Sequence, residues 1–236
     1  MHLDPTAAQR MVAWPDAPEM GQSPIRLCVP SWTYEDRYNG QPIVRHLLLG
    51  PYHLVRNSEY LASHGVEHVL CIRDPSEQRF LRELEIPGIR FTLMDVPADV
   101  SKVSIIPHFV QATRTLAELV EQQGRTVLVC CSDGVDKSSA FVAAYLMHTY
   151  ALKAADAITF VQNSRYCATP SANGYRIKLL EYEPICAAQR GANAGAQKNL
   201  RKRINNDAQD DTGEVDGGAA SAHRPIAPLP SSKRAR

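Results

Sequence analysis

The chain has 236 residues, which fits one domain with additional tails. With 44% hydrophobic and 22% charged residues it has the composition of an ordinary globular protein, and this excludes collagen-like, fibrous and strongly acidic disordered chains. The formal net charge of +1 gives no reason to expect a highly charged partner, so we expect neither nucleic acid nor a membrane surface.

The cysteines and the apolar segments bear on the compartment. Six cysteines occur without CxxC spacing, and the first residues lack the apolar run of a secretory signal, so we expect the cytoplasm or the nucleus. Neither a metal nor another cofactor is expected, because structural zinc sites pair their thiolates closely in sequence. The most apolar stretch, 140–152, is shorter than a bilayer span and predicts a core helix.

Both ends of the chain are expected to lie outside the folded domain, which we place at 36–188. Residues 1–35 contain five prolines and no sustained periodicity, which predicts an extended or disordered arm. Residues 189–236 are too poor in large apolar side chains to offset the entropy of ordering, so a disordered tail is expected. Its basic clusters, 201–203 and 233–236, are either nuclear import signals or solvated charge.

The first half of the central region alternates strand-like and helix-like segments. Residues 43–49 and 68–72 are short apolar runs typical of strands. Between them, 57–64 predicts a helix that Asn57 can cap and Gly65 can end. A strand, helix, strand unit follows from this order.

The second half continues this order. A further strand is predicted at 90–96, and apolar residues at helical spacing over 106–120, closed by Gly124, predict a one-faced helix. The continuous apolar run 126–130 is typical of a strand covered on both faces, and a strongly helix-forming segment begins at residue 140. These elements together predict an α/β domain.

The loop after this buried strand is the most informative segment for chemistry. It reads Cys131, Ser132, Asp133, Gly134, Val135, Asp136, Lys137, Ser138. A short loop entering a helix can turn successive backbone N–H groups toward one point, where the helix dipole helps them to bind a phosphate. The same field would lower the pKa of the Cys131 thiol, and Ser138 could hydrogen-bond the resulting thiolate. The alternative is a plain strand-to-helix turn with a buried cysteine and a solvated lysine.

Several motifs resemble a known family. They are LGPY at 49–52, HGVEHVLCIR at 64–73, VLVCCSDGVDKSSAFVAAYLM at 127–147, and FVQNSRYC and LLEYE near the end of the domain. Through them residues 50–183 resemble the dual-specificity branch of the cysteine-dependent protein phosphatases, and within it the STYX-like members. The resemblance implies a central mixed sheet flanked by helices, with a phosphate loop between the last core strand and a helix.

The resemblance also assigns roles to individual residues. The family's loop is His-Cys, five residues, Arg and then Ser or Thr. By this match Cys131 corresponds to the nucleophile, Gly134 to the loop glycine and Ser138 to the hydroxyl. Asp99, which lies 32 residues before Cys131, corresponds to the general acid.

The loop departs from the family at positions that matter for catalysis. Cys130 stands where the family has His, and Lys137 where it has Arg. Arginine binds two phosphoryl oxygens through its planar fork, whereas lysine is a point charge, so we expect a loss of about 3 to 4 kcal/mol in the transition state. Asp133 and Asp136 would repel a dianion and raise the Cys131 pKa if they face the loop.

These features favour a STYX-like pseudophosphatase that binds phosphorylated Ser, Thr or Tyr proteins, or signalling partners, with little or no hydrolysis. STYX-like proteins have lost the loop nucleophile, whereas this chain keeps Cys131. The alternative is therefore a slow dual-specificity phosphatase with Cys131 as nucleophile and Asp99 as general acid. A scaffold without a phosphate site is a third possibility. The resemblance also suggests partners in mitogen-activated kinase or ubiquitin-ligase pathways.

Overall fold

The computed structural model describes residues 12–24, 32–172 and 174–210, and for 193–210 the backbone alone. The chain divides into a compact unit that ends at Gly191 and a second unit that begins at Ala192. The first unit contains the sheet and the helices around it.

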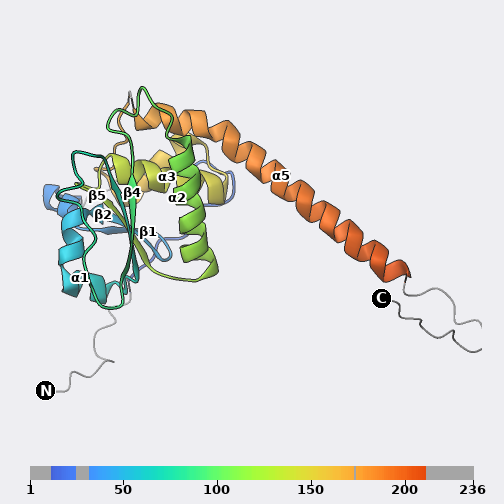
Figure 1. Cartoon of the computed structure of the whole chain (residues 1–236), viewed down its shortest axis with the longest axis horizontal. Coiled ribbons are helices and arrows are strands. Elements are labelled where there is room, and N and C mark those ends of the chain that lie inside the picture. Colours follow the sequence, from blue (N-terminus) through green and yellow to red (C-terminus); the bar gives the residue numbers. More distant parts are fainter. Residues whose placement is uncertain (1–11, 25–31, 173, 211–236) are drawn as a thin grey trace, which may run out of the picture. The chain divides into compact units, whose positions relative to one another are not determined.

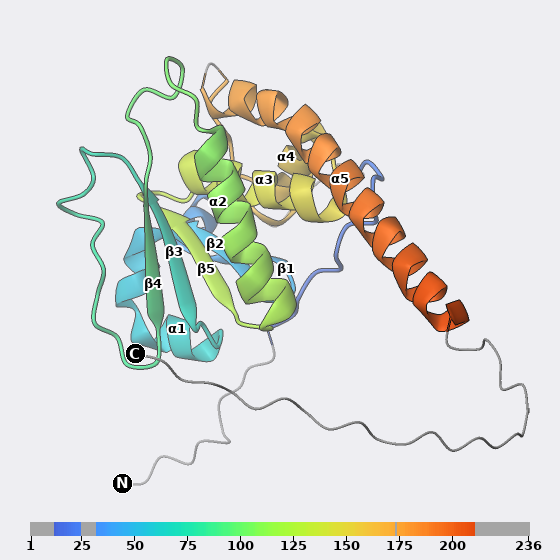
Figure 2. The same cartoon turned by 45° about the vertical axis from the view of Figure 1, so that its right-hand side comes forward.

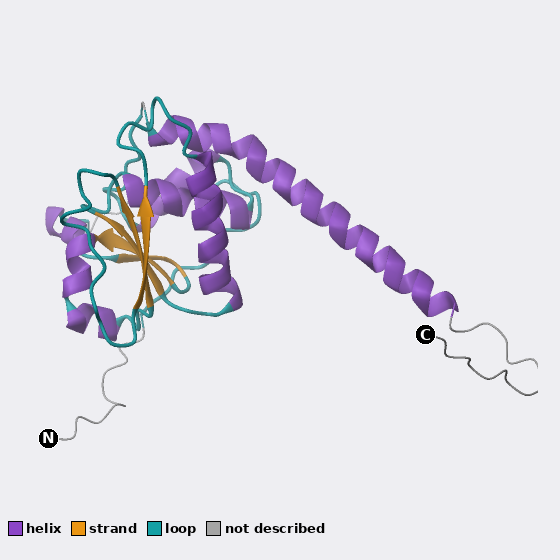
Figure 3. Ribbon diagram, in the orientation of Figure 1, coloured by secondary structure: helices purple, strands orange, loops and turns teal. Residues whose placement is uncertain are grey.

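The first unit is built on a five-stranded mixed sheet with strand order β1-β2-β5-β3-β4, drawn in orange in Figure 3. The strands are β1 (Gln41–Val44), β2 (Leu47–Pro51), β3 (His68–Arg73), β4 (Arg90–Asp95) and β5 (Val127–Cys131). β1 pairs antiparallel with β2, and the other pairings are parallel. The carboxyl ends of β2, β5, β3 and β4 therefore lie along one edge of the sheet (Figure 2).

The prediction of a single strand at 43–49 is wrong, because this run forms the hairpin of β1 and β2. His46 in the connecting turn has a left-handed backbone with a φ of 65°. Its carbonyl accepts a hydrogen bond from Val127 N at 2.8 Å. The turn is made by Arg45 and His46, which lack the glycine or asparagine that usually marks a two-residue hairpin turn, so the sequence did not indicate the reversal.

The two faces of the sheet carry separate apolar clusters. Figure 1 shows helices on both sides of the sheet. The smaller cluster packs against α1 (Ser58–Ser63), which Asn57 caps by accepting a hydrogen bond from Tyr60 N at 2.9 Å. The larger cluster packs against α2 (Ile106–Leu116), α3 (Lys137–Tyr150) and α4 (Ala154–Ser164). Residues 138–147 of α3 are all buried, which confirms the predicted core helix.

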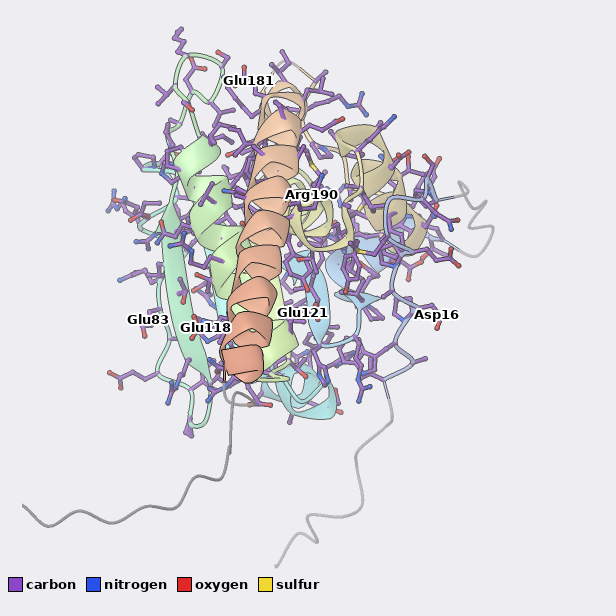
Figure 4. The ribbon with its side chains drawn as sticks, turned by 90° about the vertical axis from the view of Figure 1, so that its right-hand side faces the viewer. Asp16, Glu83, Glu118, Glu121, Glu181 and Arg190 are labelled. Carbon is purple, nitrogen blue, oxygen red and sulfur yellow. The ribbon has the colours of Figure 1, made fainter. Side chains whose placement is uncertain are left out.

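The helix predicted at 106–120 is α2 followed directly by a π-helical turn, Ala117–Gln122. Glu121 in this turn, labelled in Figure 4, accepts hydrogen bonds from the hydroxyls of Tyr145 and Tyr150 on α3. The turn therefore places a carboxylate between two tyrosines that link it to the central helix.

The last helix, α5 (Tyr175–Asp210), belongs to both units. Its first turns bury Tyr175, Leu179 and Tyr182 in the larger cluster. The helix continues through 189–210, where the sequence predicted disorder, and Ala, Gln, Lys and Arg with their high helix propensity are frequent there. The basic cluster 233–236 lies outside the described residues.

The N-terminal segment is only partly described, because residues 1–11 and 25–31 lie outside the described residues. Residues 12–24 have no regular secondary structure and contact the domain through a hydrogen bond from Gly21 N to Tyr150 O at 2.9 Å. Two short 3-10 helices, Tyr34–Tyr38 and Tyr52–Arg56, flank the hairpin. Among the described helices, none is both long and apolar enough to cross a bilayer.

Candidate functional site

The loops that follow β3, β4 and β5 meet at the carboxyl edge of the sheet. In open α/β sheets this edge is the usual position of a ligand. A cleft of about 420 Å³ lies there, and its lining includes Asp74, Asp99, Asp136, Lys137, Ser171 and Tyr175. The structure therefore brings two of the predicted site segments, Asp99 and the 131–138 loop, to one cleft.

Four consecutive carbonyl groups of the loop, those of residues 133–136, accept hydrogen bonds from Arg165, Thr169 or a serine of α3. The Asp133 and Gly134 carbonyls accept hydrogen bonds from Arg165 at 3.1 and 2.8 Å. The Val135 carbonyl accepts one from Thr169 N at 2.9 Å, and the Asp136 carbonyl accepts one from a serine hydroxyl of α3 at 2.9 Å.

Two amides of the loop act on the Cys131 sulfur. The backbone N–H groups of Gly134 and Ser138 lower the pKa of the Cys131 thiol, against the larger effect of burial. Three further features agree with this arrangement: outward carbonyls, a helix that begins at Lys137, and a left-handed glycine. The loop therefore has the geometry of an anion-binding nest rather than that of a continued helix.

Arg165 was not singled out from the sequence, yet it holds the loop in place. Its side chain is fully buried and makes five hydrogen bonds. Besides the two loop carbonyls it donates to Arg37 O at 2.8 Å, to Asn39 O at 2.7 Å and to the Gln41 side chain. Burial lowers its pKa. No local pattern could reveal this role, because the acceptors come from segments more than thirty residues away.

Gly134 is required for two separate reasons. Its φ of 70° lies in the left-handed region. A Cβ built on it would also lie 2.5 Å from the carbonyl carbon of Gly50 in β2. The backbone of the loop therefore packs directly on the neighbouring strand.

Cys131 is almost completely buried, with 1% of its surface exposed. Its sulfur accepts a hydrogen bond from Ser138 Oγ at 3.1 Å, and its thiol donates to Asp133 Oδ1 at 3.5 Å. Burial raises the pKa of the thiol, Asp133 raises it further, and the Ser138 hydroxyl and the loop amides oppose this. The predicted lowering of the pKa is therefore wrong, because withdrawal of the sulfur from water outweighs the field of the loop.

Lys137 does not extend over the loop. Its ammonium group lies 2.8 Å from Glu77 Oε1 and 3.0 Å from Asp74 Oδ2, on the turn after β3. Glu77 also accepts the Asp74 N–H at 3.0 Å, so the two carboxylates are held by their own turn. Burial opposes the charge of Lys137, but the two carboxylates raise its pKa. The cation expected to replace arginine is thus neutralised by two acids that the sequence did not indicate.

Asp99 lines the cleft but is not prepared to act as an acid. It accepts hydrogen bonds from the Ser101 hydroxyl and amide, and its carboxylate lies 2.9 Å from Lys102 Nζ. The Ser101 and Lys102 contacts lower its pKa to about 2. A general acid must be protonated when it acts, whereas this carboxylate is ionised at neutral pH.

The two other loop carboxylates point in different directions. Asp136 is half-buried, and its Oδ1 accepts a hydrogen bond from Ser171 N at 2.8 Å, away from the sulfur. Burial raises its pKa. Asp133 instead turns into the loop, where its Oδ1 accepts the Val135 N–H at 2.9 Å.

Cys130, at the family's histidine position, faces the opposite side of the sheet. It belongs to the smaller apolar cluster and is paired in register with Cys71 of β3. Its thiol pKa is raised by Cys71 and by burial. The side chains of adjacent residues in a strand point to opposite faces of the sheet, so the Cys130 side chain lies on the face opposite to that of Cys131.

Comparisons with known proteins agree with this geometry. The model of the dual specificity phosphatase catalytic domain matches residues 47–185. The human serine/threonine/tyrosine-interacting protein is 37% identical over 160 residues, which are 67% of this chain and 70% of that protein. Mouse protein phosphatase Slingshot homolog 3 is 31% identical over 187 residues, 74% of this chain but 27% of that protein. The crystal structure of the human tyrosine phosphatase-like serine/threonine/tyrosine-interacting protein superimposes with a TM-score of 0.57 at 34% identity, covering 62% of this chain and 96% of that one.

The chain therefore belongs to the dual-specificity phosphatase family. Within that family it is similar to the STYX-like serine/threonine/tyrosine-interacting proteins, in both sequence and fold. The predicted α/β class, the mixed sheet and the position of the loop are confirmed.

Proposed function

We propose that this protein is a STYX-like pseudophosphatase, a module that binds phosphorylated Ser, Thr or Tyr segments of other proteins with little or no hydrolysis. The backbone N–H groups of the loop do not depend on the lost side chains, and such groups at the start of a helix can bind a phosphoryl group. The similar human protein is named a serine/threonine/tyrosine-interacting protein, which supports a binding role.

The position of Lys137 is the observation that carries this proposal. The charge of Lys137 is neutralised by Asp74 and Glu77, so this lysine does not stabilise the phosphoryl oxygens in the transition state. Loss of one such contact costs about 3 to 4 kcal/mol, or two to three orders of magnitude in rate. The protonated Cys131 and the ionised Asp99 are each in the wrong protonation state for attack and for leaving-group protonation.

A slow dual-specificity phosphatase is the second candidate, because Cys131 is present and accepts a hydrogen bond from Ser138. In that case Cys131 attacks phosphorus and Asp99 protonates the leaving oxygen. This requires the thiolate and the protonated acid to form when substrate binds.

Turnover of an aryl phosphate by the full chain separates the two candidates. The pseudophosphatase proposal expects the wild type and Cys131→Ala to be equally close to background. The slow enzyme expects turnover that Cys131→Ala abolishes and Lys137→Arg raises. Cys130→Ala is the matched control, since it removes a buried thiol from the other face of the sheet.

Fluorescence anisotropy with labelled phosphorylated and unphosphorylated peptides tests the binding function. We expect binding of the phosphorylated peptides alone, and its loss in Gly134→Glu. Gly124→Glu is the control, because Gly124 is also left-handed but has open space around it. Ser132→Glu introduces the same charge at an exposed loop position, in case Gly134→Glu fails to fold. Phosphopeptide binding unchanged in both loop variants would contradict the proposal.

The proposal also covers the partners of the protein and its compartment. Phosphorylated proteins are the expected partners, with components of mitogen-activated kinase or ubiquitin-ligase pathways suggested by the family resemblance. The cytoplasm or the nucleus is the expected compartment. Co-precipitation from cells with the wild type and Gly134→Glu would identify partners that depend on the loop.

A further inference from the structure

The carboxylate of Asp133 lies where the loop would hold an anion. Its Oδ1 accepts the Val135 N–H at 2.9 Å, and the same oxygen accepts the Cys131 thiol proton at 3.5 Å. A phosphoryl group bound by the loop amides would accept the Val135 N–H and lie against the Cys131 sulfur. One carboxylate oxygen of Asp133 thus occupies both of these positions.

The backbone around Asp133 cannot move to withdraw the side chain. Its own carbonyl and that of Gly134 are held by Arg165, and Gly134 packs on Gly50. The Asp133 side chain itself is exposed, so rotation into solvent is the available route by which it can leave the loop. An anion can therefore enter, but only after it displaces a charge of its own sign.

Asp136 provides a contrast within the same loop. Asp136 is a carboxylate of the same loop, but its Oδ1 accepts a hydrogen bond from Ser171 N at 2.8 Å. The remaining cation of the loop, Lys137, is engaged by Asp74 and Glu77 and does not compensate Asp133.

We propose that Asp133 is an internal competitor for the anion position, which sets a low phosphate affinity. This inference rests on the proposed function of the loop and adds a determinant of its affinity. Removal of the side chain frees the Val135 N–H and removes the acceptor of the thiol proton.

Titration of the full chain with inorganic phosphate by calorimetry tests this proposal. We expect Asp133→Ala to bind phosphate about ten-fold more tightly or better, because one competing charge-assisted hydrogen bond is gone. Asp133→Asn, which keeps the acceptor without the charge, should lie in between. Asp136→Asn also removes a negative charge from the loop but does not free the Val135 N–H, so its gain in affinity should be smaller than that of Asp133→Ala.

A second readout is the thiolate absorbance of Cys131, taken as the difference from the corresponding Cys131→Ser variants. Its midpoint should fall more in Asp133→Ala than in Asp136→Asn, because Asp133 contacts the thiol directly. Equal effects of the two aspartates would overturn the proposal, because they would indicate a general field rather than occupation of the site. Unchanged or weaker phosphate binding by Asp133→Ala would also overturn it.

The two proposals fail in different ways. If the wild type binds phosphate through Gly134 but Asp133→Ala gives no gain, the proposed function stands and the role of Asp133 falls. If neither the wild type nor Asp133→Ala binds phosphate, the binding function of the loop falls as well. Circular dichroism of each variant confirms that the fold is retained.

Discussion

Replacement of Arg165 by methionine tests whether the loop depends on this buried side chain. The change removes five hydrogen bonds, each worth about 1 kcal/mol net. It leaves the buried Gly134 carbonyl without its Arg165 donor, which adds to the cost, while removal of a buried charge returns part of it. We expect the free energy of unfolding to fall by about 4 kcal/mol, a large part of the total for a domain of this size.

Urea unfolding followed by circular dichroism measures this loss, with the change read from the midpoint at an unchanged slope. Arg176→Met is the matched control, because Arg176 is exposed on α5, and it should stay within about 0.5 kcal/mol of the wild type. Phosphate binding by the folded fraction of Arg165→Met should be lost, since the loop carbonyls are then free to turn inward. A loss of stability below about 1 kcal/mol with phosphate affinity intact would refute the role of Arg165.

Three further predictions follow from the same geometry. In urea unfolding, Gly134→Ala should lower the free energy of unfolding by about 3 kcal/mol, because a steric conflict with β2 adds to the strain of the left-handed backbone. Gly124→Ala, which has the strain without the conflict, should lower it by about 1 kcal/mol. Equal losses would contradict the close contact of Gly134 with β2. The raised pKa of Cys131 predicts that its thiolate appears only in alkaline solution, above the ordinary midpoint of about 8.5, and an ultraviolet titration with a midpoint near neutrality would contradict this. Ser101→Ala should raise the pKa of Asp99 from about 2 toward its ordinary value in a carboxyl NMR titration, and no shift would show that Ser101 does not stabilise the ionised form.

The pattern of hydrophobic residues was sufficient for most of the elements. The helix capped by Asn57, the parallel strands and the buried helix after the loop were all predicted within a few residues. These features depend on local periodicity and capping, which the sequence shows directly. The hairpin of β1 and β2 was missed because its turn, Arg45 and His46, carries none of the Gly, Asn or Asp residues that usually mark such turns.

The candidate site was predicted in its position but not in its electrostatics. The family resemblance assigned Cys131, Gly134 and Asp99 to one site. The raised pKa of Cys131 and the lowered pKa of Asp99 depend on burial and on neighbouring groups, which spacing does not describe. The spacing of a motif gives positions along the chain, whereas the pKa of a side chain depends on the groups that the fold brings near it.

The sequence by itself determined that this protein is an α/β domain with a candidate phosphate loop between a buried strand and a helix. Only the tertiary structure decided the contacts of Asp136 and Lys137, which are held by Ser171 and by the turn that carries Asp74 and Glu77. The physical reason is that these partners, like the Arg165 side chain that holds the Asp133 carbonyl, are distant in sequence. Their relative free energies depend on packing, burial and hydrogen-bond geometry that no short stretch of residues contains.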